Sequence, residues 1–329
     1  MAQTVILSLD MGGTTLSYGL IQPDGRVRLQ HSIGTFARGR GEAVLEQLLE
    51  VTRTLLGAAS RRRLRVSGIG IGVPGTVDVA RGRILDNIQN VPEFEGLALG
   101  PVLRRRFSLP VHLDNDVNAL TLGEFYFGRA RGVRNFAMLA AGTGVGGGIV
   151  IEGKLARGRR GYGGETGHTT VNLDGRPCFC GSIGCIKTYA SGPDIAAQAR
   201  ERLGTAQPGR LLELCGGDPQ RLTAQEVFAA ARASDPIALE VVEIAARALG
   251  AGVANLVNLL NPEMIILGGG VLEASDLLLP RIRRWAASYA FADALRGTRL
   301  VVSRFIKRSR IKGAAALFLY ETGRPPRSS

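Results

Sequence analysis

The sequence predicts an α/β fold built from two similar domains. Residues 5–21 and 136–151 each contain an apolar run, a glycine-rich turn and a second short apolar run, which is typical of a β-hairpin. Stretches with apolar residues at helical spacing lie between and after these two segments. The repeated order indicates an internal duplication, in which each domain begins with a hairpin.

The first half of the chain alternates predicted strands with predicted helices. Its strands are short apolar runs that end at turn residues, and they cover residues 5–9, 16–21, 66–73 and 111–113. Residues 10–15 (DMGGTT) form the polar turn of the first hairpin. Apolar residues at helical spacing predict helices over residues 41–59 and 117–127.

The second half starts the same pattern again. Its predicted strands cover residues 136–140, 149–151, 264–267 and 301–302, and residues 142–148 form the glycine turn between the first two. Much of 192–260 is predicted to be helical, and a closing helix is predicted over 313–320. We expect an N-terminal domain over residues 1–117, joined by a C-terminal helix at about 308–329, and a larger domain over 118–307.

The composition excludes several classes of protein. Hydrophobic residues make up 45% of the chain, which excludes intrinsic disorder as its overall state. The net charge is +13, but the arginine runs are dispersed, so we expect solvated surface, with attraction of an anion such as ATP as the alternative. We expect no nucleic-acid partner, no signal peptide and no membrane segment. Three of the four cysteines lie close together, which favours a reducing, cytoplasmic compartment.

The glycine turns are suited to phosphate. Glycine lets backbone N–H groups approach an anion closely, threonine hydroxyls add donors, and an acidic residue at a strand end, Asp10, could hold Mg²⁺ through water. The alternatives are plain β-turns, and neither turn has the pattern of a P-loop or a Rossmann dehydrogenase. A third glycine segment after a strand could lie beside a nucleotide, or be an ordinary strand-to-helix turn. The candidates are Asp10, Gly12, Gly13, Thr14, Thr15, Gly142, Thr143, Gly144, Gly268 and Gly269.

A compact cluster of potential metal ligands follows in the second half. Three cysteines come soon after one of the three histidines, and the residues between them include turn formers. Three cysteines and one histidine are a common ligand set of structural zinc, with no open position for a reactive water. The alternative is three unconnected buried thiols. The predicted ligands are His168, Cys178, Cys180 and Cys185, and Cys215 stands apart.

Two acidic residues could act on a hydroxyl group. Asp116 follows a strand and precedes a helix, so it could take the proton of an attacking hydroxyl, with Asn115 orienting the substrate; the alternative is a helix N-cap. Glu165 lies three residues before His168, and its alternative is a solvated loop acid. A zinc-bound imidazole keeps its second nitrogen for a hydrogen bond, so His168 could bind zinc and a substrate hydroxyl together.

Taken together, these residues resemble the ROK family of sugar kinases and related repressors. The resemblance covers nearly the whole chain, and the Cys-x-Cys-Gly-x-x-Gly-Cys element after Gly-His is its most specific part. The segments that carry it are 10–15, 72–75 (GVPG), 90–92 (NVP), 113–118 (LDNDVN), 142–148, 164–168 (GETGH), 178–185 (CFCGSIGC) and 267–271 (LGGGV).

The resemblance implies an actin-like fold of the hexokinase type, related to ribonuclease H, with a cleft between two α/β domains. It implies an ATP-dependent kinase that phosphorylates the primary hydroxyl of a hexose, with glucose as the default, and an assembly of two or four identical chains. Mg²⁺ would accompany ATP, zinc would be structural, and Asp116 would be the catalytic base. The implied substrate-binding residues are Gly75, Asn90, Asn115, Asp116, Glu165, His168 and Lys187.

One position departs from the family pattern. Similar kinases have a glutamate two residues after the last cysteine, where this chain has Lys187, and lysine is a donor with no acceptor capacity. Lys187 could turn to solvent or pair with Glu165, could contact a substrate carbonyl or carboxylate, or could accompany a loss of kinase activity. The acceptor could therefore be another hexose, an amino sugar or an acidic or keto sugar.

Two other functions remain open at this point. A non-catalytic sugar-binding protein would explain Lys187. A repressor of the same family would need an N-terminal helix-turn-helix region, and the first predicted strand begins within the first ten residues, so we do not expect one.

Overall fold

The computed structural model describes residues 3–12, 15–35, 41–86, 92–203, 209–305 and 310–326. The chain divides into two compact units. The first comprises Met1–Arg134, Ile151–Gly163 and Lys307–Ser329, and the second comprises Asn135–Val150 and Gly164–Ile306. Residue 117 therefore lies inside the first unit, which also includes the C-terminal segment.

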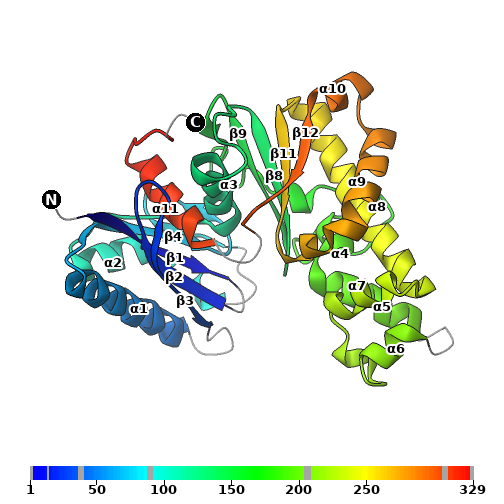
Figure 1. The fold of residues 1–329 in the computed structure, drawn as a ribbon, viewed down its shortest axis with the longest axis horizontal. Helices are drawn as coiled ribbons and strands as arrows, with labels where there is room; N and C mark the ends of the chain where they lie inside the picture. Colours follow the sequence, from blue (N-terminus) through cyan, green and yellow to red (C-terminus); the bar gives the residue numbers. More distant parts are fainter. Residues whose placement is uncertain are drawn as a thin grey trace. The chain divides into compact units, whose positions relative to one another are not determined.

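The first unit contains a mixed sheet with the strand order β3-β2-β1-β4-β7 (Figure 1). Strand β1 is antiparallel to β2, which is antiparallel to β3, whereas β1, β4 and β7 run parallel. The strands are β1 (Thr4–Met11), β2 (Thr15–Ile21), β3 (Val27–Gly34), β4 (Arg65–Val73) and β7 (Val111–Asn115). The short strands β5 (Val77–Asp78) and β6 (Arg83–Ile84) form a separate two-stranded sheet.

Helices cover both faces of this sheet, and the sequence of β4 shows why. Its isoleucines pack into the apolar core formed with helices α1 (Gly41–Arg61) and α2 (Leu99–Phe107). The glycines that alternate with them leave the other face flat for helix α11 (Arg310–Glu321), because a side chain at Gly70 would collide with the Ala314 carbonyl oxygen. A 3-10 helix spans Pro92–Phe94.

Helix α3 (Asp116–Phe127) belongs to the first unit because it packs closely on α11. A side chain at Gly313 would lie 2.7 Å from the Ala119 carbonyl oxygen, and one at Gly123 would lie 3.1 Å from the Gly313 Cα. Small residues at a crossing let two helix backbones approach each other. The glycines that permit this contact lie 190 residues apart in the sequence (313 − 123), so local patterns could not reveal it.

The second unit repeats the strand arrangement of the first. Strand β8 (Phe136–Ala141) is antiparallel to β9 (Val145–Ile151) and parallel to β11 (Met264–Gly268), which is parallel to β12 (Arg299–Val302). The short strand β10 (Lys154–Leu155) lies beside β9 at the edge of this sheet. The order β10-β9-β8-β11-β12 thus corresponds to β3-β2-β1-β4-β7. The predicted internal duplication is confirmed.

Helices supply most of the core of the second unit. The central helix α8 (Pro236–Leu260) begins at its N-cap Asp235, whose carboxylate accepts from the Ala238 N–H, and ends at Asn261 in the left-handed conformation. The other helices are α4 (Lys187–Ala190), α5 (Gly192–Leu203), α6 (Arg210–Leu214), α7 (Ala224–Arg232), α9 (Ser275–Tyr289), α10 (Ala292–Gly297) and 3-10 helices at Thr166–His168, Pro219–Arg221 and Gly270–Ala274. Among the described residues, no helix is long and apolar enough to cross a membrane.

Candidate functional site

In the first unit, acidic residues gather at the carboxyl ends of the parallel strands. Asp10 on β1 is in register with Gly72 on β4, and Gly72 is in register with Asp114 on β7. A side chain at Gly72 would lie 3.1 Å from Asp10 Oδ1 and 3.3 Å from the Asp116 Cα. The glycine therefore makes room for the Asp10 carboxylate and the start of helix α3 to lie side by side.

Asn115 is the N-cap of helix α3. Its Oδ1 accepts from the backbone N–H groups of Val117 (2.9 Å) and Asn118 (3.2 Å), and its Nδ2 donates to the Gly75 carbonyl at 3.0 Å. The N-cap alternative for Asp116 was therefore wrong, because the preceding residue fills that position. Asp116 lies in the first turn of the helix, where its Oδ1 accepts from the Val117 N–H at 2.9 Å and the helix dipole favours a negative charge.

Sequence analysis missed Asp114 and Arg157 at this site. Asp114 is 2% exposed, and it accepts from Asn118 Nδ2 at 3.0 Å and from Arg157 Nε at 2.7 Å. Burial raises the pKa of the Asp114 carboxyl, and Arg157 and Asn118 oppose that shift. Arg157 belongs to one of the dispersed arginine runs (residues 157–160), for which we expect solvated surface; this expectation is wrong for Arg157, because its side chain is 20% exposed and forms two ion pairs.

In the second unit, glycine segments occupy the equivalent strand ends. Gly142, Thr143 and Gly144 connect β8 to β9, and the Gly142 N–H donates to the Gly144 carbonyl at 2.7 Å. Thr143 and Gly144 are exposed. A side chain at Gly142 would lie 3.9 Å from the backbone nitrogen of Gly270, so the turn lies next to the glycines that follow β11. Gly269 has φ +84° and lies against Ala141, where a side chain would collide with the Ala141 carbonyl oxygen.

The glycines at positions 146–148 are not part of the turn, contrary to our prediction, because β9 already begins at Val145. A side chain at Gly147 would lie 2.5 Å from the Gly164 carbonyl oxygen and would also collide with Thr166 Oγ1. These strand glycines therefore accommodate the backbone around Glu165.

Of the predicted phosphate-binding residues in the first unit, Gly12 donates its N–H to the Thr15 carbonyl at 2.8 Å. Gly13 and Thr14, like the predicted substrate contact Asn90, lie outside the described residues.

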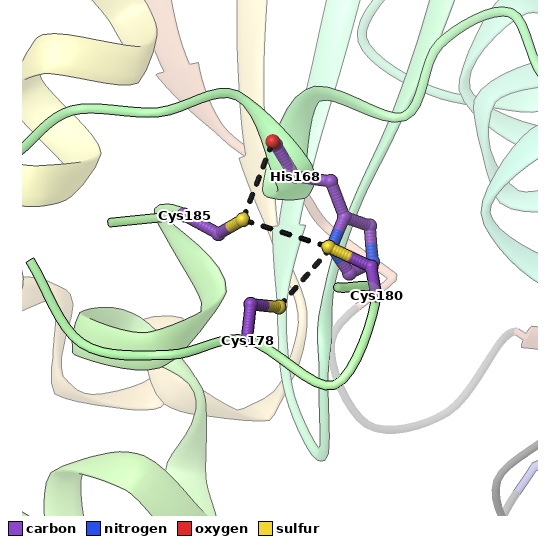
Figure 2. A group of neighbouring side chains, drawn as sticks. All are labelled: His168, Cys178, Cys180 and Cys185. Atoms are coloured by element: carbon purple, nitrogen blue, oxygen red, sulfur yellow. Dashed lines mark hydrogen bonds between the residues drawn. The ribbon is translucent and has the colours of Figure 1, made fainter. Parts of the chain in front are cut away.

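The predicted metal ligands form one cluster (Figure 2). Their ligand atoms all lie within 4.8 Å of one another. His168 Nδ1 lies 3.5 Å from Cys178 Sγ, and the Sγ atoms of Cys180 and Cys185 are 3.8 Å apart. Two sulfurs bound to one tetrahedral zinc would be about 3.8 Å apart, given a Zn–S distance of about 2.3 Å. The four residues and their spacing therefore fit a zinc ion.

The chain around the cluster holds the ligands from several directions. The Cys178 N–H donates to the Ser182 carbonyl at 2.8 Å, and the Cys185 thiol donates to the His168 carbonyl at 3.4 Å. Cys185 is fully buried, and this burial raises the pKa of its thiol to about 12. Burial also lowers the pKa of His168, and the positive charge of Lys187 acts in the same direction. Neutral histidine is the form that binds a metal ion.

Lys187 has a carboxylate partner that we did not foresee. Its Nζ lies 3.1 Å from Asp194 Oδ2 and 5.2 Å from the centre of the Phe179 ring. The Phe179 ring in turn contacts the His168 ring edge-on, with the ring centres 5.2 Å apart. Asp194 also accepts from the Ser191 hydroxyl, next to Gly192, whose N–H donates to the Gly142 carbonyl at 2.8 Å.

Comparison with known proteins agrees with this arrangement. The model of the ROK family matches residues 6–321. A glucokinase from Thermotoga maritima is 32% identical over 323 residues, which cover 98% of this chain and all of that protein. The crystal structure of a ROK family glucokinase from Streptomyces griseus, in complex with glucose and AMPPNP, matches with a TM-score of 0.81 and 32% identity over 95% of this chain and 98% of that chain.

Transcriptional regulators of the same family also match this chain. The crystal structure of a ROK family transcriptional regulator has a TM-score of 0.84 and 31% identity, and the match covers 96% of this chain and 78% of that chain. The two units thus have the two-domain, actin-like α/β fold that we expected from the resemblance. From the family model, the relatives and the cluster of one histidine and three cysteines, we conclude that this chain belongs to the ROK family.

Proposed function

We propose that this chain transfers the γ-phosphate of ATP to the primary hydroxyl of a hexose, with glucose as the expected acceptor. The observation that carries the proposal is the position of Asp116. Because Asn115 caps helix α3, the Asp116 carboxylate is not needed as the cap, and the Asp116 backbone lies beside the strand end that carries Asp10. The ROK glucokinases of similar sequence and structure support the same activity.

The first unit supplies the acid–base chemistry in this proposal. The sugar oxygen forms a bond to the γ-phosphorus, the bond from that phosphorus to the departing ADP breaks, and the hydroxyl proton passes to Asp116. Asn115 and Gly75 orient the acceptor, as does Asn90. Asp10, which is 6% exposed at the end of β1, would hold Mg²⁺ through water, and Mg²⁺ would neutralise charge on the phosphates.

The second unit supplies backbone donors and sugar contacts. The exposed turn Gly142–Gly144 and the neighbouring Gly268 and Gly269 bind the nucleotide, as Gly12, Gly13, Thr14 and Thr15 do in the first unit. His168, Cys178, Cys180 and Cys185 would hold zinc, which would fix the loop that carries Glu165. His168 Nδ1 faces Cys178, so the opposite nitrogen, Nε2, and the Glu165 carboxylate are assigned to sugar hydroxyls.

The decisive experiment combines the purified protein with Mg-ATP and a panel of neutral, amino, acidic and keto sugars, and measures ADP release for each. We expect turnover with glucose or a close relative. Turnover restricted to an acidic or keto sugar would instead assign specificity to Lys187. Sugar binding by calorimetry without ADP release, from folded protein with bound zinc, would contradict the proposed kinase and favour a binding protein.

A regulator is the second candidate, because a ROK transcriptional regulator has a similar structure. The repressor alternative predicts specific binding to an operator sequence at physiological salt, which gel shift would detect. We expect only weak binding that salt abolishes, because the arginines are dispersed along the chain.

The proposal includes a cytoplasmic enzyme that assembles from two or four identical chains. The grouping of three cysteines with His168 suits a metal ion better than a disulfide, which supports a reducing compartment. A groove of about 770 Å³ beside α8, lined by Ile244, Ala248 and Ala251 and by the 81% exposed Leu173, offers an apolar surface for a second copy. We expect sedimentation to show a dimer or tetramer, and Ala251→Arg to yield monomers. A monomeric wild-type protein would contradict this part.

A further inference from the structure

We propose that Arg157 is a positioning residue of the phosphoryl-transfer centre, which acts by holding Asp114 beneath the segment Asn115–Asn118. The inference rests on the proposed function, because it assumes that Asp116 in this segment takes up the proton. It assigns a role to a residue that contacts neither the sugar nor ATP in that proposal.

Arg157 connects two carboxylates that are remote in sequence. Its Nε donates to Asp114 Oδ2 at 2.7 Å, and its Nη2 donates to Glu321 Oε1 at 2.6 Å. The guanidinium also lies 5.5 Å from the centre of the Tyr320 ring. We call Asp114, Arg157 and Glu321 the arginine clasp. A planar guanidinium can serve two carboxylates at fixed angles, which the single charge of lysine cannot reproduce.

The clasp is connected directly to the segment that carries Asp116. The second carboxylate oxygen of Asp114, Oδ1, accepts from the Asn115 N–H at 2.7 Å and from Asn118 Nδ2 at 3.0 Å. Asn115 in turn caps helix α3 and binds the Gly75 carbonyl. One buried carboxylate thus joins Arg157 to both ends of the segment, and it needs a cation because Asp114 is almost completely buried.

The clasp also anchors a segment that connects the units along the chain. Residues 151–163 leave the second unit after β9 and return to it at Gly164, one residue before Glu165. Within the first unit this segment is tied down at three points: the Leu155 N–H donates to the Tyr320 hydroxyl at 3.0 Å, Arg157 forms the clasp, and Tyr162 donates to Asp86. The Gly163 N–H donates to the Arg157 carbonyl at 2.8 Å.

Substitution of Arg157 should therefore displace Asp116, the proton acceptor, without removing any contact to the substrates. A misplacement of about 1 Å can cost about 100-fold in rate, so we expect Arg157→Met to lower kcat by about 10- to 100-fold with both KM values within about threefold of wild type. Arg157→Lys should recover only part of kcat. The control is Arg81→Met, which removes an exposed arginine paired with Asp78 and should leave kcat unchanged.

Further measurements separate positioning from stability. If Arg157→Met is unstable, Asp114→Asn tests the same link with a side chain of the same shape, and the double variant should be no slower than the slower single variant. Hydrogen exchange of residues 111–118 should increase in Arg157→Met but not in Arg81→Met. A lower melting temperature with unchanged kcat and unchanged exchange would overturn the inference. A wild-type protein that turns over no sugar would overturn the proposed function instead, and hydrogen exchange would still decide the role of the clasp.

Discussion

The two units share one strand arrangement but end their strands in different chemistry. In the first unit, the neighbouring strand ends carry Asp10 and Asp114, and Asp116 follows directly. In the second unit, the equivalent strands β8 and β11 end in glycine segments, at Gly142 and Gly268. The strand ends of the first unit carry carboxylates, whereas those of the second unit carry glycines, whose backbone is not covered by side chains.

This difference shows how a duplicated fold can divide one reaction. The parallel strands bring their carboxyl ends to one edge in each unit, whatever residues stand there. Carboxylates at that edge can hold a divalent cation or accept a proton, whereas exposed N–H groups and glycines can bind phosphate. In the proposed function, the residue types at each edge give the two units different tasks, so substitutions at equivalent edges should have different consequences.

The largest effect is expected from the carboxylates of the first unit. Asp116→Asn should lower kcat by about 100- to 10,000-fold, because the amide cannot accept the hydroxyl proton. Steady-state ADP release measures the effect, and zinc content and melting temperature should match wild type. Asp78→Asn, at a half-buried acid of the same unit that pairs with the exposed Arg81, is the matched control. Full activity of Asp116→Asn would contradict the assignment of acid–base chemistry to the strand ends of the first unit.

The metal loop of the second unit should give the next largest effect. We expect one zinc per chain by elemental analysis, and Cys185→Ser should lose it because a buried ligand is missing. The KM for the sugar should rise by about 10- to 100-fold, as the loop of His168 and Glu165 loses its anchor. Cys215→Ser, at a buried thiol outside the cluster, should keep the zinc and the KM. Zinc retained by Cys185→Ser would contradict the ligand assignment.

Two glycines of the β8–β9 hairpin should respond differently to alanine. Gly147→Ala should destabilise the protein by about 1–3 kcal/mol, because the new methyl group collides with Thr166 and Gly164. Gly144→Ala meets no atom within 4 Å, so thermal unfolding should show little change, while the KM for ATP should rise severalfold if the turn binds phosphate. An unchanged KM for ATP in Gly144→Ala would contradict the phosphate assignment of the turn.

The smallest effect is expected at Lys187. The ion pair with Asp194 is partly exposed, with side-chain exposures of 16% and 20%, so Lys187→Met should cost less than about 1 kcal/mol of stability in chemical denaturation. If Lys187 serves mainly this ion pair, the KM for glucose should change less than threefold. A tenfold change would show that the ammonium group contacts the sugar, and would make Lys187 a determinant of specificity.

Local sequence patterns predicted most of the strands and the residues of the metal cluster. The apolar runs of β1, β4, β8 and β11 are buried on both faces, so they form continuous hydrophobic segments that are easily recognised. Strand β3 was missed because it is largely exposed and carries mixed polar residues. The four residues of the candidate metal cluster were recognised because they lie within 18 residues of one another (168 to 185).

Local patterns were enough to predict the α/β class, the duplication and the proposed ligand set, because each depends on residues that are close along the chain. The choice of Asn115 over Asp116 as the cap of α3 is fixed with the bond from Asn115 to the Gly75 carbonyl, 40 residues away. The glycines after Val145 and the position of Arg157 between Asp114 and Glu321 depend on partners between 17 and 164 residues away (147 to 164, 157 to 321). Burial of a charge beside such a partner is a property of packing, and no local pattern along the chain encodes it.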